Sequence, residues 1–326
     1  MTKITFNNQT FDADTRLSVL DNLLQKNEDI DYSCKSGNCQ SCLLKCNKGY
    51  VPESAQNGLK STQKSQGYFL SCQCFPTDDM NISEPNQLQT SLESKIISLT
   101  LLSHNVLGIK ISCPPNFFAY PGQYIHLITP HKINRCYSIA NQPKKDGFIE
   151  LHVKYIKNGK MSDWLFNTSK EGMSVYISDP IGNCFYCINE PDEKNYSLIL
   201  AGTTTGLAPL LGIIRESLSQ KHQGEIVLFH GGKEERDLYY QAFLHKMASQ
   251  YKNFTYCPCI LEKGSRNIFL TGDMTQHILE KLPKNNQTKL YLCGNPHFVN
   301  NLRKKAFLGG IASQNIFCDA FTNKGS

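Results

Sequence analysis

Four cysteines stand at a spacing that suits an iron–sulfur cluster. Cys34, Cys39 and Cys42 form a C-x4-C-x2-C run, and Cys72 follows later in the chain. A [2Fe–2S] cluster is held by four thiolates, and this spacing is typical of the plant-type form. Gly37, inside the run, lets the backbone turn closely. The alternatives are a structural zinc site, which more often takes two close pairs, and four unrelated thiols. The four-residue gap favours the cluster.

The remaining cysteines are expected to be ordinary reduced thiols. Cys46 and Cys74 lie next to the predicted ligands, but Cys72 directly follows the strand-like run GYFLS and is the expected fourth ligand. Cys257 and Cys259 have a metal-like spacing without a second pair nearby, which indicates buried, inert thiols. The chain has 14 cysteines and begins with polar residues that do not form a signal peptide, so a disulfide scaffold is not expected.

The composition is that of a globular protein of several domains. The chain has 326 residues, of which 40% are hydrophobic and 19% charged, and this excludes a disordered chain. No apolar run reaches the roughly 18 residues that a membrane-spanning helix needs, so a cytoplasmic protein is expected. The net charge of +6 is too small to indicate nucleic-acid binding. Residues 1–88 carry a net charge of −2 and the rest +8, which fits a basic body that binds anionic ligands.

Two regions with different patterns come first. Residues 1–88 begin with an alternating stretch that predicts a hairpin and continue with an amphipathic helix, for which Asp14 and Thr15 are the expected capping residues. Residues 95–192 contain short β-rich runs separated by turn residues, with one helix at Ser162–Asn167. This pattern predicts a small antiparallel β-barrel.

The last region, residues 196–326, alternates apolar strands with helices. The helices are expected at about Ala208–Gln220, Leu238–Gln250 and Pro296–Phe307. Continuous apolar strands followed by amphipathic helices predict a doubly wound parallel sheet. The fold class is therefore multidomain: an α+β domain for the cluster, an antiparallel β-barrel and an α/β domain. A polar linker near Gln87–Ser94 separates the first two.

A glycine- and threonine-rich segment follows the first apolar strand of the predicted sheet. It consists of Gly202, Thr203, Thr204, Thr205 and Gly206, and a helix comes next. In a doubly wound sheet the phosphates of a dinucleotide bind at this place, against the helix N-terminus. An ordinary structural turn is the alternative. The segment predicts a dinucleotide site.

Several stretches resemble a family of electron-transfer reductases. They are YSCKSGNCQSC, GYFLSCQC, PGQYIHLI, NRCYSIAN, IELHVKYIKNGKMSDWLFN and CDAFT, and the resemblance covers nearly the whole chain. These stretches are similar to the flavin- and iron–sulfur-containing NAD(P)H reductases of the ferredoxin–NADP reductase superfamily, which begin with a ferredoxin domain of β-grasp fold. Within the superfamily, the chain looks most like reductases that serve CDP-6-deoxyhexulose 3-dehydrases, and next like the reductase components of oxygenases.

The resemblance implies an FAD site on the barrel. Arg135, Tyr137 and Ser138 match the family motif R-x-Y-S. In the family, the arginine binds the flavin pyrophosphate and the tyrosine stacks on the isoalloxazine ring. The serine hydroxyl lies near flavin N5, where hydride arrives, so Ser138 is a predicted catalytic residue. Phe321 is similar to a terminal aromatic residue near the flavin, and ordinary packing is its alternative.

A second flavin element is implied by the turn before the predicted barrel helix. Gly159, Met161 and Ser162 belong to it, and the first helical amides and the Ser162 hydroxyl are expected to meet phosphate oxygens. Two phosphates favour FAD over FMN. His152 and Lys154, on the preceding strand, resemble family positions beside the cofactor. A solvated strand face is the alternative for these two.

The nicotinamide side is implied by a second motif. Cys293, Gly294, Asn295 and Pro296 resemble the family sequence C-G-x-P, and Cys293 is expected to orient the ring as a catalytic residue without acting as a nucleophile. In the phosphate-binding segment, Thr204 stands where the family commonly has glycine.

Charged residues after the second strand of the sheet bear on the choice between NADH and NADPH. Glu234, Glu235 and Asp237 would repel a 2′-phosphate, whereas Lys233 and Arg236 would attract one. NADH is favoured.

The resemblance implies an oxidoreductase that passes electrons from NAD(P)H through FAD to a [2Fe–2S] cluster and then to a separate protein. A CDP-6-deoxyhexulose dehydrase is the expected acceptor, and an oxygenase component is the alternative. A different class of function is a pure electron carrier, in which the flavin and nucleotide regions are only scaffold.

Overall fold

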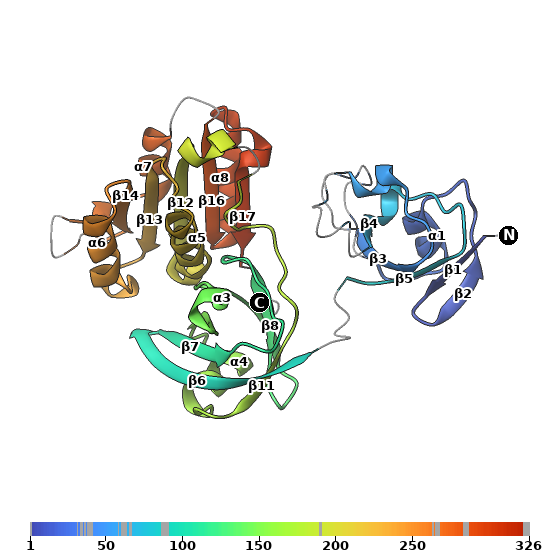
Figure 1. Ribbon diagram of the computed structural model, residues 1–326, viewed down its shortest axis with the longest axis horizontal. Helices are drawn as coiled ribbons and strands as arrows, with labels where there is room; N and C mark the ends of the chain where they lie inside the picture. The colour runs from blue at the N-terminus through green and yellow to red at the C-terminus, as the bar shows by residue number, and fades with distance from the viewer. Residues whose placement is uncertain are drawn as a thin grey trace. The chain divides into compact units, whose positions relative to one another are not determined.

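The computed structural model describes residues 2–30, 32, 35, 37, 42–57, 59, 64, 67–85, 91–188, 191–262, 264, 268–282 and 287–321. The chain divides into two compact units, Met1–Gln89 and Thr90–Ser326 (Figure 1). Among the helices in these ranges, none combines the length and the apolar character needed to cross a membrane.

In the described residues, the first unit is a five-stranded mixed sheet with helix α1 packed against it. The strand order is β2-β1-β5-β3-β4, in which only β1 and β5 are parallel. Helix α1 packs Val19, Leu20 and Leu23 against the sheet, which gives the expected α+β domain. The elements are β1 (Lys3–Phe6), β2 (Gln9–Asp12), α1 (Val19–Gln25), β3 (Leu43–Lys48), η1 (Glu53–Gln56), β4 (Tyr68–Leu70), η2 (Ser71–Gln73) and β5 (Met80–Ser83).

Helix α1 is capped by Ser18, so the predicted cap at Asp14 and Thr15 was wrong. Ser18 Oγ accepts a hydrogen bond from the Asp21 backbone N–H (3.0 Å) and donates one to Asp21 Oδ2 (2.6 Å). A serine three residues before an acidic residue satisfies the first turn in this reciprocal way. The Asp14 carboxylate instead accepts from the backbone and guanidinium of Arg16.

The second unit begins with a six-stranded antiparallel sheet of order β10-β7-β6-β11-β8-β9. A bridge between Ile139 and Leu151 joins its two edges and closes the barrel. Met161, Trp164 and Leu165 of α4 pack into the barrel core. The elements are β6 (Leu92–Ser103), β7 (Val106–Ser112), β8 (Tyr124–Ile128), β9 (Asn134–Ser138), α3 (Pro143–Asp146), β10 (Phe148–Lys154), α4 (Lys160–Asn167) and β11 (Ser174–Ile177).

The rest of the second unit is a parallel sheet of order β15-β14-β13-β12-β16-β17, as the alternating pattern predicts. Helices α5 and α6 cover one face of this sheet, and α7 and α8 cover the other (Figure 1). The elements are η3 (Pro191–Asn195), β12 (Ser197–Thr203), η4 (Thr204–Gly206), α5 (Leu207–Ser219), β13 (Ile226–Gly232), η5 (Glu235–Asp237), α6 (Gln241–Gln250), β14 (Phe254–Ile260), β15 (Leu270–Thr271), α7 (Met274–Lys281), β16 (Thr288–Gly294), α8 (Pro296–Leu308), η6 (Ser313–Asn315) and β17 (Ile316–Ala320). The three predicted helices are present as α5, α6 and α8.

Candidate functional site

The carboxyl ends of β12 and β16 meet where the strand order of the parallel sheet reverses. β12 pairs with β13 on one side and with β16 on the other. Ligands of doubly wound sheets bind at such a reversal. The backbone there leaves no room for side chains, because a Cβ on Gly206 would collide with the carbonyl oxygen of Cys293, and one on Gly294 would lie 2.6 Å from Thr203 Oγ1. The missing Cβ atoms at Gly206 and Gly294 let the two strand ends lie close together.

Thr204 adopts a backbone conformation that usually belongs to glycine. Its φ is 50°, in the left-handed region that glycine adopts more readily than other residues. The conformation costs about 1–2 kcal/mol for a residue with a Cβ. Helix α5 follows with Gly206 as its N-cap, which offers no side chain to the first helical amides. The Leu207 N–H already donates to the Thr204 carbonyl oxygen and Pro209 has no N–H, so the first turn of α5 offers a pyrophosphate the Ala208 amide at most.

Strand β17 brings a carboxylate that the sequence did not single out. The parallel pairing of β16 and β17 sets Asp319 beside Cys293. Ser138 Oγ donates a hydrogen bond to Asp319 Oδ2 over 2.9 Å. Burial raises the pKa of Asp319, and the hydrogen bond from Ser138 lowers it in part. This bond joins β9, which carries the predicted flavin motif, to β17, the neighbour of the strand that carries the predicted nicotinamide motif.

Cys293 is fully buried, and its Sγ lies 3.6 Å from the Sγ of Cys184. Burial raises the pKa of Cys293 well above the usual range. Because the thiolate is the nucleophilic form, this protonated thiol is not expected to attack a substrate. The side chain has no exposed surface, so its expected role in orienting the nicotinamide stays a prediction.

The rest of the C-G-x-P motif acts through its backbone and through helix capping. Asn295 Oδ1 accepts a hydrogen bond from the His297 backbone N–H (2.9 Å) and caps α8, and Pro296 is the first residue of that helix. The Phe321 backbone N–H donates to the Gly294 carbonyl oxygen over 2.8 Å. The Phe321 backbone therefore lies next to the motif, and the expected place of its ring near the flavin stays a prediction.

Strand β9 carries the predicted flavin motif. The Arg135 side chain is exposed, and its Nη1 donates to the Asn134 carbonyl oxygen (2.7 Å), which leaves further guanidinium N–H groups for a phosphate. Tyr137 is half-buried against the barrel core, and burial raises the pKa of its hydroxyl. Ser138 is buried at the end of the strand. An exposed arginine followed by an aromatic ring and a hydroxyl suits FAD.

The turn before α4 differs in part from the expectation. Ser162 Oγ accepts from the Ile156 backbone N–H (3.0 Å) and lies 3.0 Å from the Gly159 carbonyl oxygen, so its hydroxyl already stabilises the turn. Met161 is buried in the barrel core. Gly159 is the N-cap and has no side chain, so the first amides of α4 are the groups that fit a flavin phosphate. Lys154 is half-buried at the end of β10.

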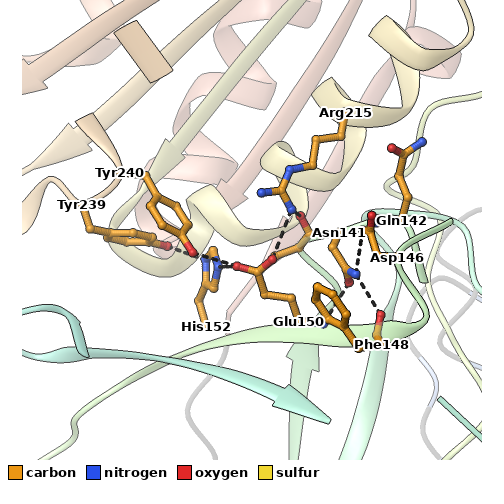
Figure 2. Close-up of polar contacts among 10 residues, drawn as sticks. Asn141, Gln142, Asp146, Phe148, Glu150, His152, Arg215, Tyr239 and Tyr240 are labelled. Carbon is orange, nitrogen blue, oxygen red and sulfur yellow. Dashed lines mark hydrogen bonds and ion pairs between the residues drawn. The ribbon is translucent and has the colours of Figure 1, made fainter. Parts of the chain in front are cut away.

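His152 does not match its expected place beside FAD. The ring is 4% exposed, and both of its nitrogens already have partners. Nδ1 lies 2.9 Å from the Tyr239 hydroxyl, and Nε2 lies 3.2 Å from Glu150 Oε1 (Figure 2). No ring nitrogen is left for a cofactor.

In the first unit, two of the four predicted cluster ligands lie in the described residues. Cys42 and Cys72 are both buried, and burial raises the pKa of the Cys42 thiol to about 11. Gln73 Nε2 lies 3.6 Å from Cys72 Sγ, within the distance of an amide hydrogen bond to sulfur. Gly37 has a φ of 80°, and a Cβ there would lie 3.1 Å from Gln73 Cγ. Paired thiols with an amide donor beside them suit an iron–sulfur cluster.

The other two predicted ligands, Cys34 and Cys39, lie outside the described residues. Cys74 is buried in the hydrophobic core of the unit, and burial raises its pKa to about 12. Cys46 is half-buried on β3. Both placements agree with ordinary thiols.

Comparisons with known families match each part of the chain separately. Residues 4–77 match the family described as 2Fe-2S iron-sulfur cluster binding domain. Residues 93–186 match the oxidoreductase FAD-binding domain. Residues 198–304 match the oxidoreductase NAD-binding domain.

Curated relatives and solved structures match the whole chain. It is 26% identical to the reductase component of the naphthalene 1,2-dioxygenase system of Pseudomonas putida, over 97% of this chain and 96% of that protein. It is 27% identical to a CDP-6-deoxy-L-threo-D-glycero-4-hexulose-3-dehydrase reductase of Yersinia pestis, over 95% of each. A crystal structure of a cytochrome P450 reductase from Amycolatopsis has a similar fold, with a TM-score of 0.69, 24% identity and 99% of each chain covered. The chain is therefore an oxidoreductase with a 2Fe-2S domain, an FAD-binding domain and an NAD-binding domain, in which electrons pass from NAD(P)H through FAD to a [2Fe–2S] cluster.

Proposed function

We propose that this oxidoreductase takes hydride from NADH between Ser138 and Cys293 and delivers the electrons to a separate protein. The observation that supports this most is the hydrogen bond from Ser138 to Asp319, because it fixes the flavin motif next to the strand end that carries Cys293. FAD, when bound, accepts two electrons as hydride and releases them one at a time to the cluster.

The chain's own residues bind and orient both cofactors. Arg135 and the first amides of α4 bind the flavin phosphates, and Gly202–Gly206, the segment before α5, binds those of the dinucleotide. Ser138 donates its hydroxyl hydrogen to Asp319. The lone pairs of its oxygen therefore remain free to accept a hydrogen bond from an N–H group of the flavin. The buried residues around Cys293 exclude water from the place where hydride is transferred.

The segment after β13 favours NADH over NADPH. Arg236 pairs with Glu234 (2.8 Å), and Lys233 lies 3.6 Å from Glu262. Asp237 Oδ2 accepts hydrogen bonds from the backbone N–H groups of Lys233 and Glu234 and so shapes the turn. Because each cation of the turn already has a carboxylate partner, neither is available to neutralise a 2′-phosphate.

Glu234→Gln should shift the preference toward NADPH, because Arg236 loses its partner and a negative charge leaves the turn. We expect the ratio of kcat/KM for NADPH to that for NADH to rise about tenfold, which corresponds to about 1.4 kcal/mol. Steady-state reduction of ferricyanide with each nucleotide measures the ratio. Glu171→Gln, an exposed change on the barrel, is the matched control. An unchanged ratio in the Glu234 variant would contradict the assignment.

We propose a CDP-6-deoxyhexulose dehydrase as the electron acceptor and the cytoplasm as the location. The named Yersinia relative and the stretches PGQYIHLI and NRCYSIAN support the acceptor, and the many reduced cysteines support the location. Mixing the purified protein with NADH under anaerobic conditions should bleach the flavin and then the cluster. A flavin that NADH does not bleach would instead support a pure electron carrier. Reconstitution with a dehydrase and with an oxygenase component decides the acceptor, and turnover only with the oxygenase would overturn our choice.

A further inference from the structure

A buried polar cluster lies outside the site described above. We call it the Glu150 cluster, and it consists of Glu150, His152, Arg215, Tyr239 and Tyr240. Glu150 Oε1 accepts from the Tyr240 hydroxyl (2.8 Å) and lies 3.2 Å from His152 Nε2. Glu150 Oε2 accepts from Arg215 Nη1 (3.1 Å). Figure 2 shows the carboxylate between these three partners.

The cluster joins the barrel to the parallel sheet. Glu150 and His152 belong to β10 of the barrel, whereas Arg215 lies on α5 and the two tyrosines precede α6. His152 completes the connection because its Nδ1 lies 2.9 Å from the Tyr239 hydroxyl. One carboxylate of the barrel therefore organises two separate segments of the nucleotide domain.

Burial makes this arrangement sensitive to the loss of any partner. Glu150 is 4% exposed and His152 is 4% exposed. Burial alone raises the pKa of Glu150, but the hydrogen bonds from His152 and Tyr240 and the charge of Arg215 hold it below its usual range. Burial lowers the pKa of His152, so Nε2–H of a neutral ring donates to Glu150 and Nδ1 accepts from Tyr239. An ionised carboxylate that loses its donors in such a place is strongly destabilised.

The joined segments are those that we assign to the cofactors. Helix α5, which carries Arg215, begins directly after Thr204–Gly206. Tyr239 and Tyr240 follow the turn that ends at Asp237. On the barrel side, the Ala140 backbone N–H donates to the Glu150 carbonyl oxygen (2.9 Å), and Ala140 lies two residues after Ser138. Tyr240 has a φ of 58°, a strained left-handed conformation that its surroundings maintain.

We propose that Glu150 and His152 are positioning residues for hydride transfer, which hold the nucleotide domain at the distance from the flavin motif that the reaction needs. The inference rests on the NADH site proposed above. Neither side chain has to touch a cofactor for this role. Hydride transfer depends steeply on donor–acceptor distance, and a misplacement of about 1 Å costs about 100-fold in rate.

Glu150→Gln tests the proposal, because an amide cannot accept from all three donors with both of its terminal atoms. We expect stoichiometric FAD and a Kd for NADH within about threefold of the wild type. The limiting rate of flavin reduction in stopped flow should fall by about 10- to 100-fold. The kinetic isotope effect with NADH deuterated at the transferred position should change as well. An unchanged rate and isotope effect per bound flavin would overturn the proposal.

A second variant and a measurement without cofactors keep the test decisive. Tyr240→Phe removes a single donor and should slow flavin reduction in the same direction, whereas Tyr251→Phe, an exposed change on the same domain, should not. If Glu150→Gln fails to fold, Tyr240→Phe decides.

In the FAD-free protein, amide hydrogen exchange over Thr204–Ser219 should accelerate in both variants, and 15N NMR should show a changed His152 tautomer in Glu150→Gln. Unchanged exchange and tautomer would count against us. A wild-type protein whose flavin NADH does not reduce would instead refute the proposed function.

Discussion

Cys72→Ser should abolish the visible absorption of the iron–sulfur cluster and the reduction of any protein acceptor, while NADH still reduces the flavin. We predict Cys72 as one of the four thiolates that hold the cluster, and a serine hydroxyl is a poor ligand for its iron. The flavin and nucleotide residues belong to the other compact unit and keep their own core. Iron analysis, visible absorption and NADH–ferricyanide activity of the same preparation measure the effect. The expected loss of acceptor reduction is complete, and ferricyanide activity should change less than about twofold.

Cys74→Ser is the matched control for this experiment. Cys74 lies two residues further along the chain, but its side chain is in the hydrophobic core of the unit. We expect this variant to keep its iron and its spectrum and to lose about 1 kcal/mol of stability, because a hydroxyl replaces a buried thiol. A Cys74 variant without cluster beside a Cys72 variant with cluster would refute the ligand assignment.

Asp319→Asn should slow flavin reduction by NADH by about 10- to 100-fold, because the charge-assisted hydrogen bond that holds the Ser138 hydroxyl becomes a weaker neutral one. The amide oxygen still accepts from Ser138, so the geometry is retained while the negative charge is lost. Stopped-flow reduction measures the rate, and Ser138→Ala and the double variant complete a cycle. Because Ser138 and Asp319 act through one hydrogen bond, the double variant should be little slower than either single one. Two effects that simply add would show that the residues act independently.

The same variant should be at least as thermostable as the wild type at neutral pH. Burial raises the pKa of Asp319 above its usual 3.8, so the ionised form is less favourable in the folded protein than in the unfolded chain. This contribution to stability is fully present below 3.8 and is lost as the pH rises through the raised pKa. The gain in Tm from Asp319→Asn should therefore shrink as the pH falls toward 3.8. Flavin release on heating, followed by fluorescence, measures Tm, and a large loss at pH 7 would contradict the argument.

Local pattern predicted much of this molecule. The spacing of the cysteines, the runs of β residues and the alternation of strands and helices predicted the three-domain architecture. The resemblance of the nucleotide loop to its family pointed to Thr204 as a residue in a place where glycine is common. Thr204 has a left-handed backbone, which glycine adopts more easily than threonine. Strand β14 was not predicted, because Pro258 lies within it and proline usually excludes a central strand.

Side-chain contacts between residues far apart in the sequence could not be predicted from local sequence patterns. Asp319 meets Ser138 across 181 positions of the chain, and only the docking of the barrel onto the parallel sheet brings them together. His152 was assigned to the flavin because it lies on the right strand, but the side-chain direction depends on Tyr239 in the other domain. Ser162 was assigned from a helix start, where a hydroxyl can bind either a ligand or its own turn. The single charged residue within the otherwise apolar run IFCDAF was the signal that the sequence offered for Asp319.

The shared carboxylate of Glu150 limits how freely the parts of such reductases can be interchanged. A chimera that takes its barrel from this chain and its nucleotide domain from a relative separates Glu150 and His152 from Arg215, Tyr239 and Tyr240. Unless the relative supplies equivalent donors, the hybrid carries an unsatisfied buried charge at the junction of its two parents. A chimera should therefore take the barrel and the nucleotide domain from the same protein, or be changed at all five residues of the Glu150 cluster. In protein engineering they form one exchangeable module.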